Sequence, residues 1–535
     1  MSSLRRATAV MTLGTVVSRA TGLARLAAIT AALGIVESGH VTDTYNIANT
    51  APNILYELIL GGVITSVFVP VFVELLEKEG RERAWEVASA IINLALVVLT
   101  AITVLGIVTA PWIARFYASS IQASSAQEHQ VQVEVLTFWL RTFFPQIIFY
   151  GLYAMTSGLL NAHRRFGPPM YTPVLNNLAV IAVFIAFHFA FGAVASLDAL
   201  TPMQLVVIGV GTTLGVFLQA VAQIPFLRGL GGYRFTLSPR HPSIRRLGHL
   251  AVFMIGYVIT NQIGYLVVQK LAYAETGGYS AYVTAFTFYM LPHGLFAVSI
   301  ITALLPSMSQ SAVNDDYVSF RERLTTGIRA TFFLILPAAI GYFVLAEPIL
   351  DLLLNRGVMT IRSVDLVAVV LRFFVLGLVQ FSIFQLLLRA YYALQDTRTP
   401  FFINCGAVAL NTAINIPMFH FLGVEGLAAG HALAYTFGMA MQAFYLGRRL
   451  GGLGVRRLAA GLWRTAAAGA GMGAIVYIAY RMIAAVTPQD AAGDFGRVLV
   501  PVLVGVVAYG GLAVALRVEE LSFVRGVFTR RLHRD

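Results

Sequence analysis

The chain has 535 residues, of which 58% are hydrophobic and 12% charged, and it carries a net charge of +12. A soluble domain is about 45–50% apolar and about 25% charged, so this composition excludes an ordinary soluble protein. Many apolar runs have the length of about 20 residues at which an α-helix crosses a bilayer. They lack the alternation of apolar and polar residues that a membrane β-barrel needs. The sequence therefore predicts an all-α polytopic membrane protein.

The apolar runs predict about fourteen transmembrane helices, and an even number places both termini on one side. Arginine is concentrated near the N-terminus, in alternate loops and in the C-terminal tail, whereas the loops at 35–42, 195–202 and 420–426 contain no lysine or arginine. By the positive-inside rule both termini are cytoplasmic. The same rule explains the positive net charge, so we expect no nucleic-acid partner. The spans centre near residues 10–34, 44–73, 86–110, 134–160, 172–194, 203–227, 248–272, 280–308, 328–348, 366–393, 400–422, 425–447, 463–484 and 496–517.

The first predicted span carries two arginines, Arg19 and Arg25. Each costs about 2.5–3.5 kcal/mol at the centre of a membrane helix, and such residues usually face a bundle interior or a water-filled cavity. Ser18 and Arg25 lie seven residues apart, on one helix face, and Arg19 flanks that face. We interpret this face as the wall of an anion-binding cavity, because a guanidinium donates two parallel hydrogen bonds to a phosphate. The alternatives are snorkelling and ion pairs with internal carboxylates, namely Asp43 or Glu57.

The second predicted span, DTYNIANTAPNILYELILGG, is unusually polar for a membrane helix. Four of its polar residues follow a single helical stripe. A stripe of this kind is costly against lipid, so we expect it to line the cavity. Interhelical hydrogen bonding is the alternative. The stripe consists of Asn46, Asn49, Asn53 and Glu57, and Asp43 precedes it.

Three polar residues in the predicted spans 400–422 and 425–447 suggest a cation site. Asn411 and Asn415 lie one turn apart, and with Thr436 they offer oxygens to a small cation; hydrogen bonds between packed helices are the alternative reading. The sequence contains no G-x-x-x-x-G-K-[ST] phosphate loop and no cluster with metal-ligand spacing. We therefore expect transport driven by the membrane potential or an ion gradient, with Na⁺ or H⁺ as the coupling ion, without a metal or another cofactor and without enzymatic activity.

Two segments echo each other across the chain. YTPVLNNLAVIAVF (171–184) is similar to RTPFFINCGAVALN (398–411), six spans later. Repeats of equal orientation are a known transporter plan, in which two halves rock around a central cavity. The repeat predicts an N-lobe at 1–228 (helices 1–6) and a C-lobe at 229–450 (helices 7–12). Two additional helices and a cytoplasmic tail occupy 451–535.

Four motifs together resemble the MurJ/MviN family of bacterial lipid II flippases, in the multidrug/oligosaccharidyl-lipid/polysaccharide exporter superfamily. The resemblance implies two six-helix lobes around a cationic cavity, with helices 13 and 14 forming a groove for the lipid tail. Only Lys78 and Lys270 are lysines, an arginine bias similar to that of actinobacterial members. The motifs are SRATGLAR (18–25), DTYNIANTAPNILYELILGGVITSVFVPVF (43–72), LPHGLFAVSIITALLPSMS (291–309) and RAYYALQDTRTP (389–400).

The resemblance also assigns roles to residues. It implies that Arg19 and Arg25 meet the pyrophosphate of the lipid, and it matches a family aspartate with Asp43 and a Pro-Asn pair with Asn53. The sequence departs from the family pattern at Tyr56 and Thr287, where arginines are common. The cavity is therefore predicted to be less cationic. Carboxylates that bind sodium in helices 7 and 11 of some relatives are absent, and helix 11 offers the two asparagines instead.

The sequence thus predicts a lipid II flippase in the bacterial cytoplasmic membrane. It would move undecaprenyl-pyrophosphate-linked peptidoglycan precursor from the inner to the outer leaflet by alternating access. Its partners would be that lipid or a related polyprenyl-pyrophosphate glycolipid, membrane lipids and peptidoglycan-synthesis proteins. The alternatives are another lipid-linked oligosaccharide flippase, a drug/cation antiporter, a non-transporting scaffold and a membrane glycosyltransferase.

Overall fold

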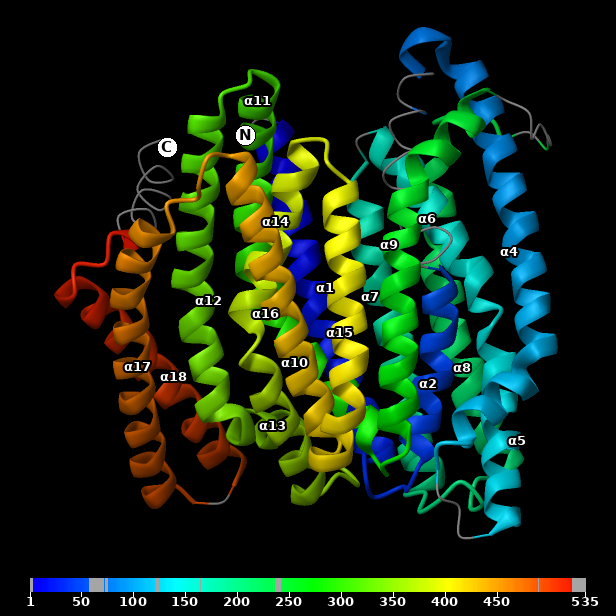
Figure 1. Ribbon diagram of the computed structural model, residues 1–535. Coiled ribbons are helices and arrows are strands. Elements are labelled where there is room, and N and C mark those ends of the chain that lie inside the picture. Colours follow the sequence, from blue (N-terminus) through cyan, green and yellow to red (C-terminus); the bar gives the residue numbers. More distant parts are fainter. Residues whose placement is uncertain are drawn as a thin grey trace. The chain divides into compact units, whose positions relative to one another are not determined.

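A computed structural model describes residues 3–56, 72, 76–121, 125–163, 165–233, 235, 242–488 and 490–521. The described part of the chain is built from helices and contains no β-strand, which confirms the predicted fold class (Figure 1). Helices are the expected outcome because hydrocarbon offers no partners to backbone N–H and C=O groups. The chain forms two compact units, Met1–Ser280 with Arg356–Thr360, and Ala281–Asn355 with Ile361–Asp535. The lobe boundaries at residues 228 and 450 stay a prediction.

The first unit is a helical bundle that packs around aromatic residues. Tyr45 is fully buried, and its ring meets the rings of Trp139, Phe143 and Phe184 edge to face. Its hydroxyl lies 3.2 Å from that of Thr212, so the polar atom of this buried side chain has a hydrogen-bond partner. The helices of this unit are α1 (Ser3–Leu33), α2 (Val41–Tyr56), α4 (Gly80–Ala118), α5 (Ala126–Phe143), α6 (Gln146–Ala162), α7 (Gly167–Phe191), α8 (Pro202–Val221), the short η3 (Ile224–Leu227) and α9 (Pro242–Tyr273).

Several helices of the second unit are broken or bent. Its π-helical turn η4 lies between two α-helices, and a bend of 49° separates α13 from α14. The bend falls at Gly377, where an added methyl group would lie 2.6 Å from the backbone of Ala432, so the close approach of α16 requires glycine. The helices are α10 (Gly278–Pro292), η4 (His293–Ala297), α11 (Val298–Val313), α12 (Tyr317–Leu354), α13 (Ile361–Val375), α14 (Leu378–Ala393), α15 (Arg398–Leu422), α16 (Val424–Arg449), α17 (Val455–Val486) and α18 (Ala491–Ala515).

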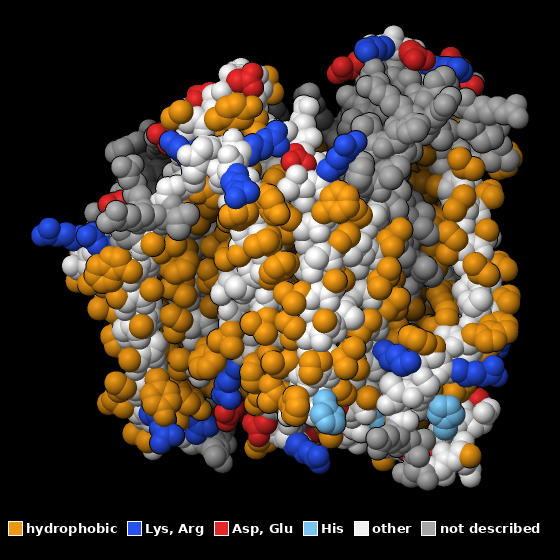
Figure 2. Space-filling view, viewed as in Figure 1, with side chains coloured by type: hydrophobic (Ala, Val, Ile, Leu, Met, Phe, Trp, Pro, Cys, Tyr) orange, Lys and Arg blue, Asp and Glu red, His pale blue; other side chains and the backbone are white. Residues whose placement is uncertain are grey.

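Thirteen of the fourteen predicted spans coincide with a described helix or with consecutive helices, and the described part of the remaining span, 44–73, is mainly α2 (Val41–Tyr56). Within the described residues, ten segments are long and apolar enough to cross a membrane, or eleven if the bent pair α13–α14 is one span. The described parts of α2, α9 and α16 do not meet that standard, so the count of fourteen stays a prediction. On the face shown in Figure 2, hydrophobic side chains cover α17, and charged side chains gather near helix ends. The chain is a multi-pass membrane protein.

An ion-pair cluster ties the end of the described chain to α12. The Arg329 guanidinium donates to Glu519 at 2.7 Å and also pairs with Glu520. Glu520 is 7% exposed, whereas the side chain of Glu519 is 71% exposed. The arginine holds the pKa of Glu519 below its usual value. Beside this cluster, the Tyr509 hydroxyl on α18 donates to the Phe333 carbonyl on α12 at 2.7 Å. Polar contacts therefore hold both α18 and the segment that follows it to α12.

Replacing Arg329 with alanine should destabilise the second unit by about 1–3 kcal/mol, because a buried carboxylate, Glu520, loses its cation. Glu519→Gln is the matched control and should cost less than about 1 kcal/mol, since exposed ion pairs contribute little. The measurement is the free energy of unfolding of the full chain in detergent. Equal effects of the two substitutions would show that the burial of Glu520 does not matter.

Candidate functional site

Tyr150 on α6 links Arg25 on α1 with Asn53 on α2 through an electrostatic interaction and a hydrogen bond. The half-buried arginine on α1 lies within electrostatic range of the Tyr150 hydroxyl on α6, and that hydroxyl hydrogen-bonds the Asn53 side chain on α2. Asn53 also donates to the Asn49 carbonyl at 3.2 Å. The structure therefore brings together two predicted site residues, Arg25 and Asn53. Sequence reasoning missed Tyr150, because a tyrosine in the apolar run FPQIIFYGLY has no pattern that distinguishes it from a packing residue.

The other predicted residues of the first span lie around this group. Ser18 is half-buried and its carbonyl accepts from Asn177 of α7 at 3.3 Å, while Arg19 is exposed. Gly22 lies between Ser18 and Arg25, and an added methyl group there would be 3.8 Å from the Asn177 amide nitrogen. That is ordinary contact, so packing does not demand a glycine. The face that carries Ser18 is thus partly covered by α7.

Within the described residues, neither Arg19 nor Arg25 forms an ion pair. Asp43, one of the two carboxylates considered as a partner, is engaged elsewhere. Glu57, the other, lies outside the described residues, and so does the side chain of Tyr56, whose backbone ends α2. A guanidinium in an apolar helix is stable when it faces water, an anion or an internal partner. The geometry around Arg25 is therefore suited to an anionic group that also accepts hydrogen bonds from neutral donors.

Asp43 is a completely buried structural carboxylate in this structure. It accepts from the backbone N–H groups of Gly277 at 2.7 Å and Ser280 at 2.8 Å, and from the Ser280 hydroxyl at 2.7 Å. The His40 imidazole lies 3.4 Å away. These bonds cap the first turn of α10, where unpaired N–H groups favour a negative charge. Asp43 is also ten residues, or about 15 Å along the helix axis, from Asn53. Its predicted contact with the lipid is not tested by this arrangement.

The polar residues along α2 fall into two groups, one engaged in packing and one with an unsatisfied polar atom. Asn46 donates to the Ser280 hydroxyl at 3.0 Å and so joins the same packing contact as Asp43. The side-chain oxygen of Asn49 is buried and has no hydrogen-bond partner among the described residues. Asn53 lies one turn further along the stripe and hydrogen-bonds Tyr150. Packing therefore accounts for the first turns of α2, and the later turns carry the unsatisfied polar atom.

The remaining predicted site residues belong to the second unit. The Thr287 hydroxyl on α10 donates to the Val283 carbonyl one turn back, at 2.9 Å. The amides of Asn411 and Asn415 on α15 hydrogen-bond each other, the shorter contact being 3.0 Å. The Thr436 hydroxyl donates to the Ala432 carbonyl at 2.7 Å. In this state the oxygens proposed for a cation are engaged in helix-internal bonds, and the cation site stays a prediction.

Two other basic residues of the first unit, Lys270 and Arg141, pack against α4. The Lys270 ammonium lies 4.2 Å above the centre of the Phe116 ring, a cation–π contact. The Arg141 guanidinium is exposed and donates to the Ile107 carbonyl at 3.4 Å. Both cations therefore have local partners on α4.

The fold and the site together define a class: a multi-pass α-helical membrane protein with an intramembrane arginine that lacks an ion-pair partner within the described residues. The family model described as lipid II flippase MurJ matches residues 31–488. The chain belongs to this MurJ family.

Curated relatives align with most of the chain. A lipid II flippase MurJ of Burkholderia cenocepacia is 30% identical over 77% of this chain and 78% of its own length. A probable lipid II flippase MurJ of Bdellovibrio bacteriovorus is 28% identical over 96% of this chain and 95% of its own length.

Solved structures support the fold. A lipid II flippase MurJ in an inward closed conformation has a TM-score of 0.74 at 21% identity, covering 95% of this chain and 98% of that one. A multidrug resistance MATE family transporter of the MOP superfamily, in an inward-facing conformation, has a TM-score of 0.66 at 14% identity, covering 81% and 95%. These similarities show that the chain has the helical fold shared by both kinds of transporter.

Asp43→Asn should reduce the stability of the first unit by about 1–3 kcal/mol, because the new amide N–H groups would face donors that now bond a carboxylate. Thermal unfolding of the full chain in detergent measures this loss. The control is Asp198→Asn, which removes an exposed carboxylate and should leave the unfolding midpoint unchanged. An unchanged midpoint for Asp43→Asn would contradict the capping role.

Proposed function

We propose that the protein is a lipid II flippase that moves undecaprenyl-pyrophosphate-linked peptidoglycan precursor from the inner to the outer leaflet by alternating access. The observation that carries the proposal is the group formed by Arg25, Asn53 and Tyr150. A pyrophosphate offers many acceptor oxygens and negative charge. A guanidinium supplies charge and a bidentate fork, and amide and phenol donors supply neutral hydrogen bonds. Membership of the MurJ family supports the choice of this cargo.

The proposed location is the bacterial cytoplasmic membrane, with both termini in the cytoplasm. The arginine-rich loops support this orientation through the positive-inside rule. In this orientation the precursor enters from the leaflet where the cytoplasmic loops lie, and proteins of peptidoglycan synthesis receive it on the other side. The protein catalyses no bond change in this scheme, and its work is to shield a charged headgroup from hydrocarbon.

The coupling energy is proposed to come from the membrane potential or an ion gradient, with Na⁺ or H⁺ as the ion. The headgroup is anionic, so its movement carries net charge across the membrane. The membrane potential therefore drives this movement directly, by about 2.3 kcal/mol per charge per 100 mV. For sodium, Asn411 and Asn415 would have to exchange their mutual hydrogen bonds for the ion.

The cargo is tested in a bacterium that relies on this chain as its lipid II flippase. An enzyme that cleaves lipid II only from outside is added, and the cleaved product is quantified. We expect Arg25→Ala to reduce the product at least about tenfold, since one charged hydrogen-bonding group is worth about 1.5–3 kcal/mol. The amount of product with Arg25→Lys should lie between those of the wild type and Arg25→Ala, because lysine keeps the charge but lacks the bidentate guanidinium. Tyr150→Phe should cause a smaller loss than Arg25→Ala.

Arg115→Ala is the matched control, because Arg115 is an exposed arginine at the end of α4. It should leave the amount of product unchanged. Full activity of Arg25→Ala would refute the proposed role of the arginine. If the wild-type chain is folded in the membrane but yields no product, the proposal for this cargo fails, and another lipid-linked oligosaccharide becomes the candidate.

The energy source is tested with ionophores in the same cells. Collapsing the membrane potential and the ion gradients while ATP is maintained should stop the appearance of cleaved product. Replacing external Na⁺ with K⁺ then separates sodium from proton coupling. Undiminished transport without any gradient would contradict the proposed energy source.

A further inference from the structure

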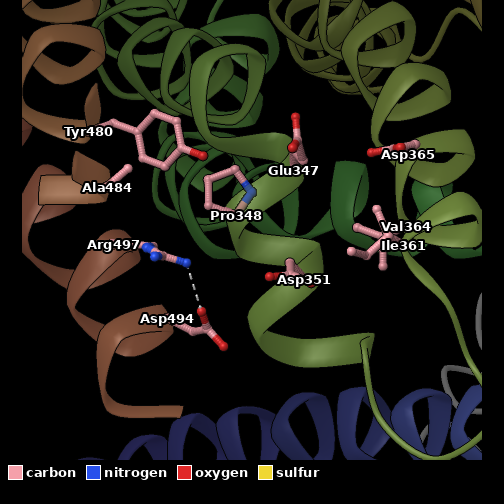
Figure 3. Close-up of a pocket in the computed structure, with 10 residues that line it drawn as sticks. All are labelled: Glu347, Pro348, Asp351, Ile361, Val364, Asp365, Tyr480, Ala484, Asp494 and Arg497. Atoms are coloured by element: carbon pink, nitrogen blue, oxygen red, sulfur yellow. Dashed lines mark hydrogen bonds and ion pairs between the residues drawn. The ribbon is translucent and has the colours of Figure 1, made fainter. Parts of the chain in front are cut away.

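A separate cavity of about 300 Å³ lies in the second unit, among α12, α13, α17 and α18 (Figure 3). It is formed by the last turns of α12 and α17 and the first turns of α13 and α18, so it lies at one end of these helices. The proposed topology puts that end outside the cell. Its volume is about ten times the 30 Å³ that a water molecule occupies in the liquid, and it falls at the small end of ligand pockets.

The charges that line this cavity are unequal. Four carboxylates and one guanidinium line it. The guanidinium, Arg497, lies 3.2 Å from Asp494, and Glu347 has Arg372 at 3.5 Å. Asp351 accepts from the neutral amide of Asn355 at 2.7 Å. Asp365 has neither a hydrogen bond nor an ion pair among the described residues. The excess negative charge therefore belongs to Asp351 and Asp365, on neighbouring helices.

The rest of the lining indicates what kind of cation fits. The Tyr480 side chain points from α17 toward the α12 wall, and its hydroxyl is within electrostatic range of two carboxylates, Glu347 and Asp351, and of two arginines, Arg497 and Arg481. An aromatic ring beside carboxylates attracts organic cations through its negative face. Pro348, Val364 and Ala484 add apolar surface for carbon atoms.

A bare metal ion fits this lining poorly. Calcium takes six to eight oxygen ligands at about 2.3–2.6 Å. Among the described residues, no three His, Cys, Asp or Glu side chains are close enough to hold a metal ion together. Carboxylates spread over a wide cavity instead suit an extended cation that meets them one at a time.

We propose that this cavity binds an organic primary ammonium group, which donates to Asp351 and Asp365 while its carbon chain packs against Tyr480. Either the headgroup of an aminophospholipid in the outer leaflet or a soluble polyamine carries this chemistry. The cavity is built from residues that take no part in the Arg25 group, so the site acts independently of the proposed cargo site.

Two probes distinguish the sources. The full chain is placed in phosphatidylcholine nanodiscs, whose lipid has no net charge and no primary amine, and spermidine binding is measured by calorimetry. In mixed nanodiscs, native mass spectrometry measures the phosphatidylethanolamine that the protein retains. We expect at least one probe to bind saturably, and the double variant Asp351→Asn with Asp365→Asn to bind it at least about tenfold more weakly. Asp198→Asn, an exposed carboxylate elsewhere, should bind like the wild type.

A pair of substitutions at one position tests the ring without changing any charge. Tyr480→Phe keeps the aromatic face and should bind within about twofold of the wild type, whereas Tyr480→Leu should bind several-fold more weakly. Added salt should weaken binding to the wild type, since the attraction is electrostatic. This salt titration needs no variant, so it remains decisive if the double variant does not fold.

Retention of phosphatidylethanolamine alone supports the lipid source, and binding of spermidine alone supports the soluble source. Binding that is equal in the wild type and the double variant, or insensitive to salt, would overturn the proposal. Saturable Ca²⁺ binding with no binding of either amine would overturn it as well, because the site would then be a metal site.

Discussion

The absence of water in hydrocarbon is the constraint on which this structure depends. Every polar atom inside the membrane has to find a partner in the protein, a ligand or a water-filled space. Asp43 meets this requirement fully, with three hydrogen bonds from the segment that begins α10. Arg25 has no ion pair among the described residues and lies within electrostatic range of Tyr150, which hydrogen-bonds Asn53. The contrast separates a charge that holds the fold from a charge available to a ligand.

The same constraint explains why several conspicuous polar residues are structural. A polar side chain that bonds its own helix or its neighbour is satisfied without a ligand. Asn411 and Asn415 bond each other, and the Thr287 hydroxyl bonds the preceding turn. Such bonds have modest net value, and they are exchangeable when a ligand offers a better partner. A transport protein therefore accommodates polar residues in one state that serve a ligand in another.

The second unit shows a different use of charge, at helix ends. Arg329 and two glutamates fasten the end of the described chain to α12, with one carboxylate buried and one exposed. At the opposite end of α12, carboxylates surround an open cavity in which acids outnumber bases. The first arrangement neutralises its charges internally, and the second leaves an excess. Membership of the MurJ family accounts for the fold that carries both ends.

The sequence by itself determined the fold class, the positions of the apolar helices and the family, because composition, hydrophobic length and local motifs are properties of consecutive residues. It also predicted Arg25 and Asn53 as site residues. The tertiary structure decided which polar residues are engaged: it added Tyr150 and assigned Asp43 to a cap on α10. It also assembled a cavity from two helix pairs, α12–α13 and α17–α18, that are far apart in the sequence. A sequence pattern records which side chains share a helix face, but their partners come from other helices, and only packing brings those together.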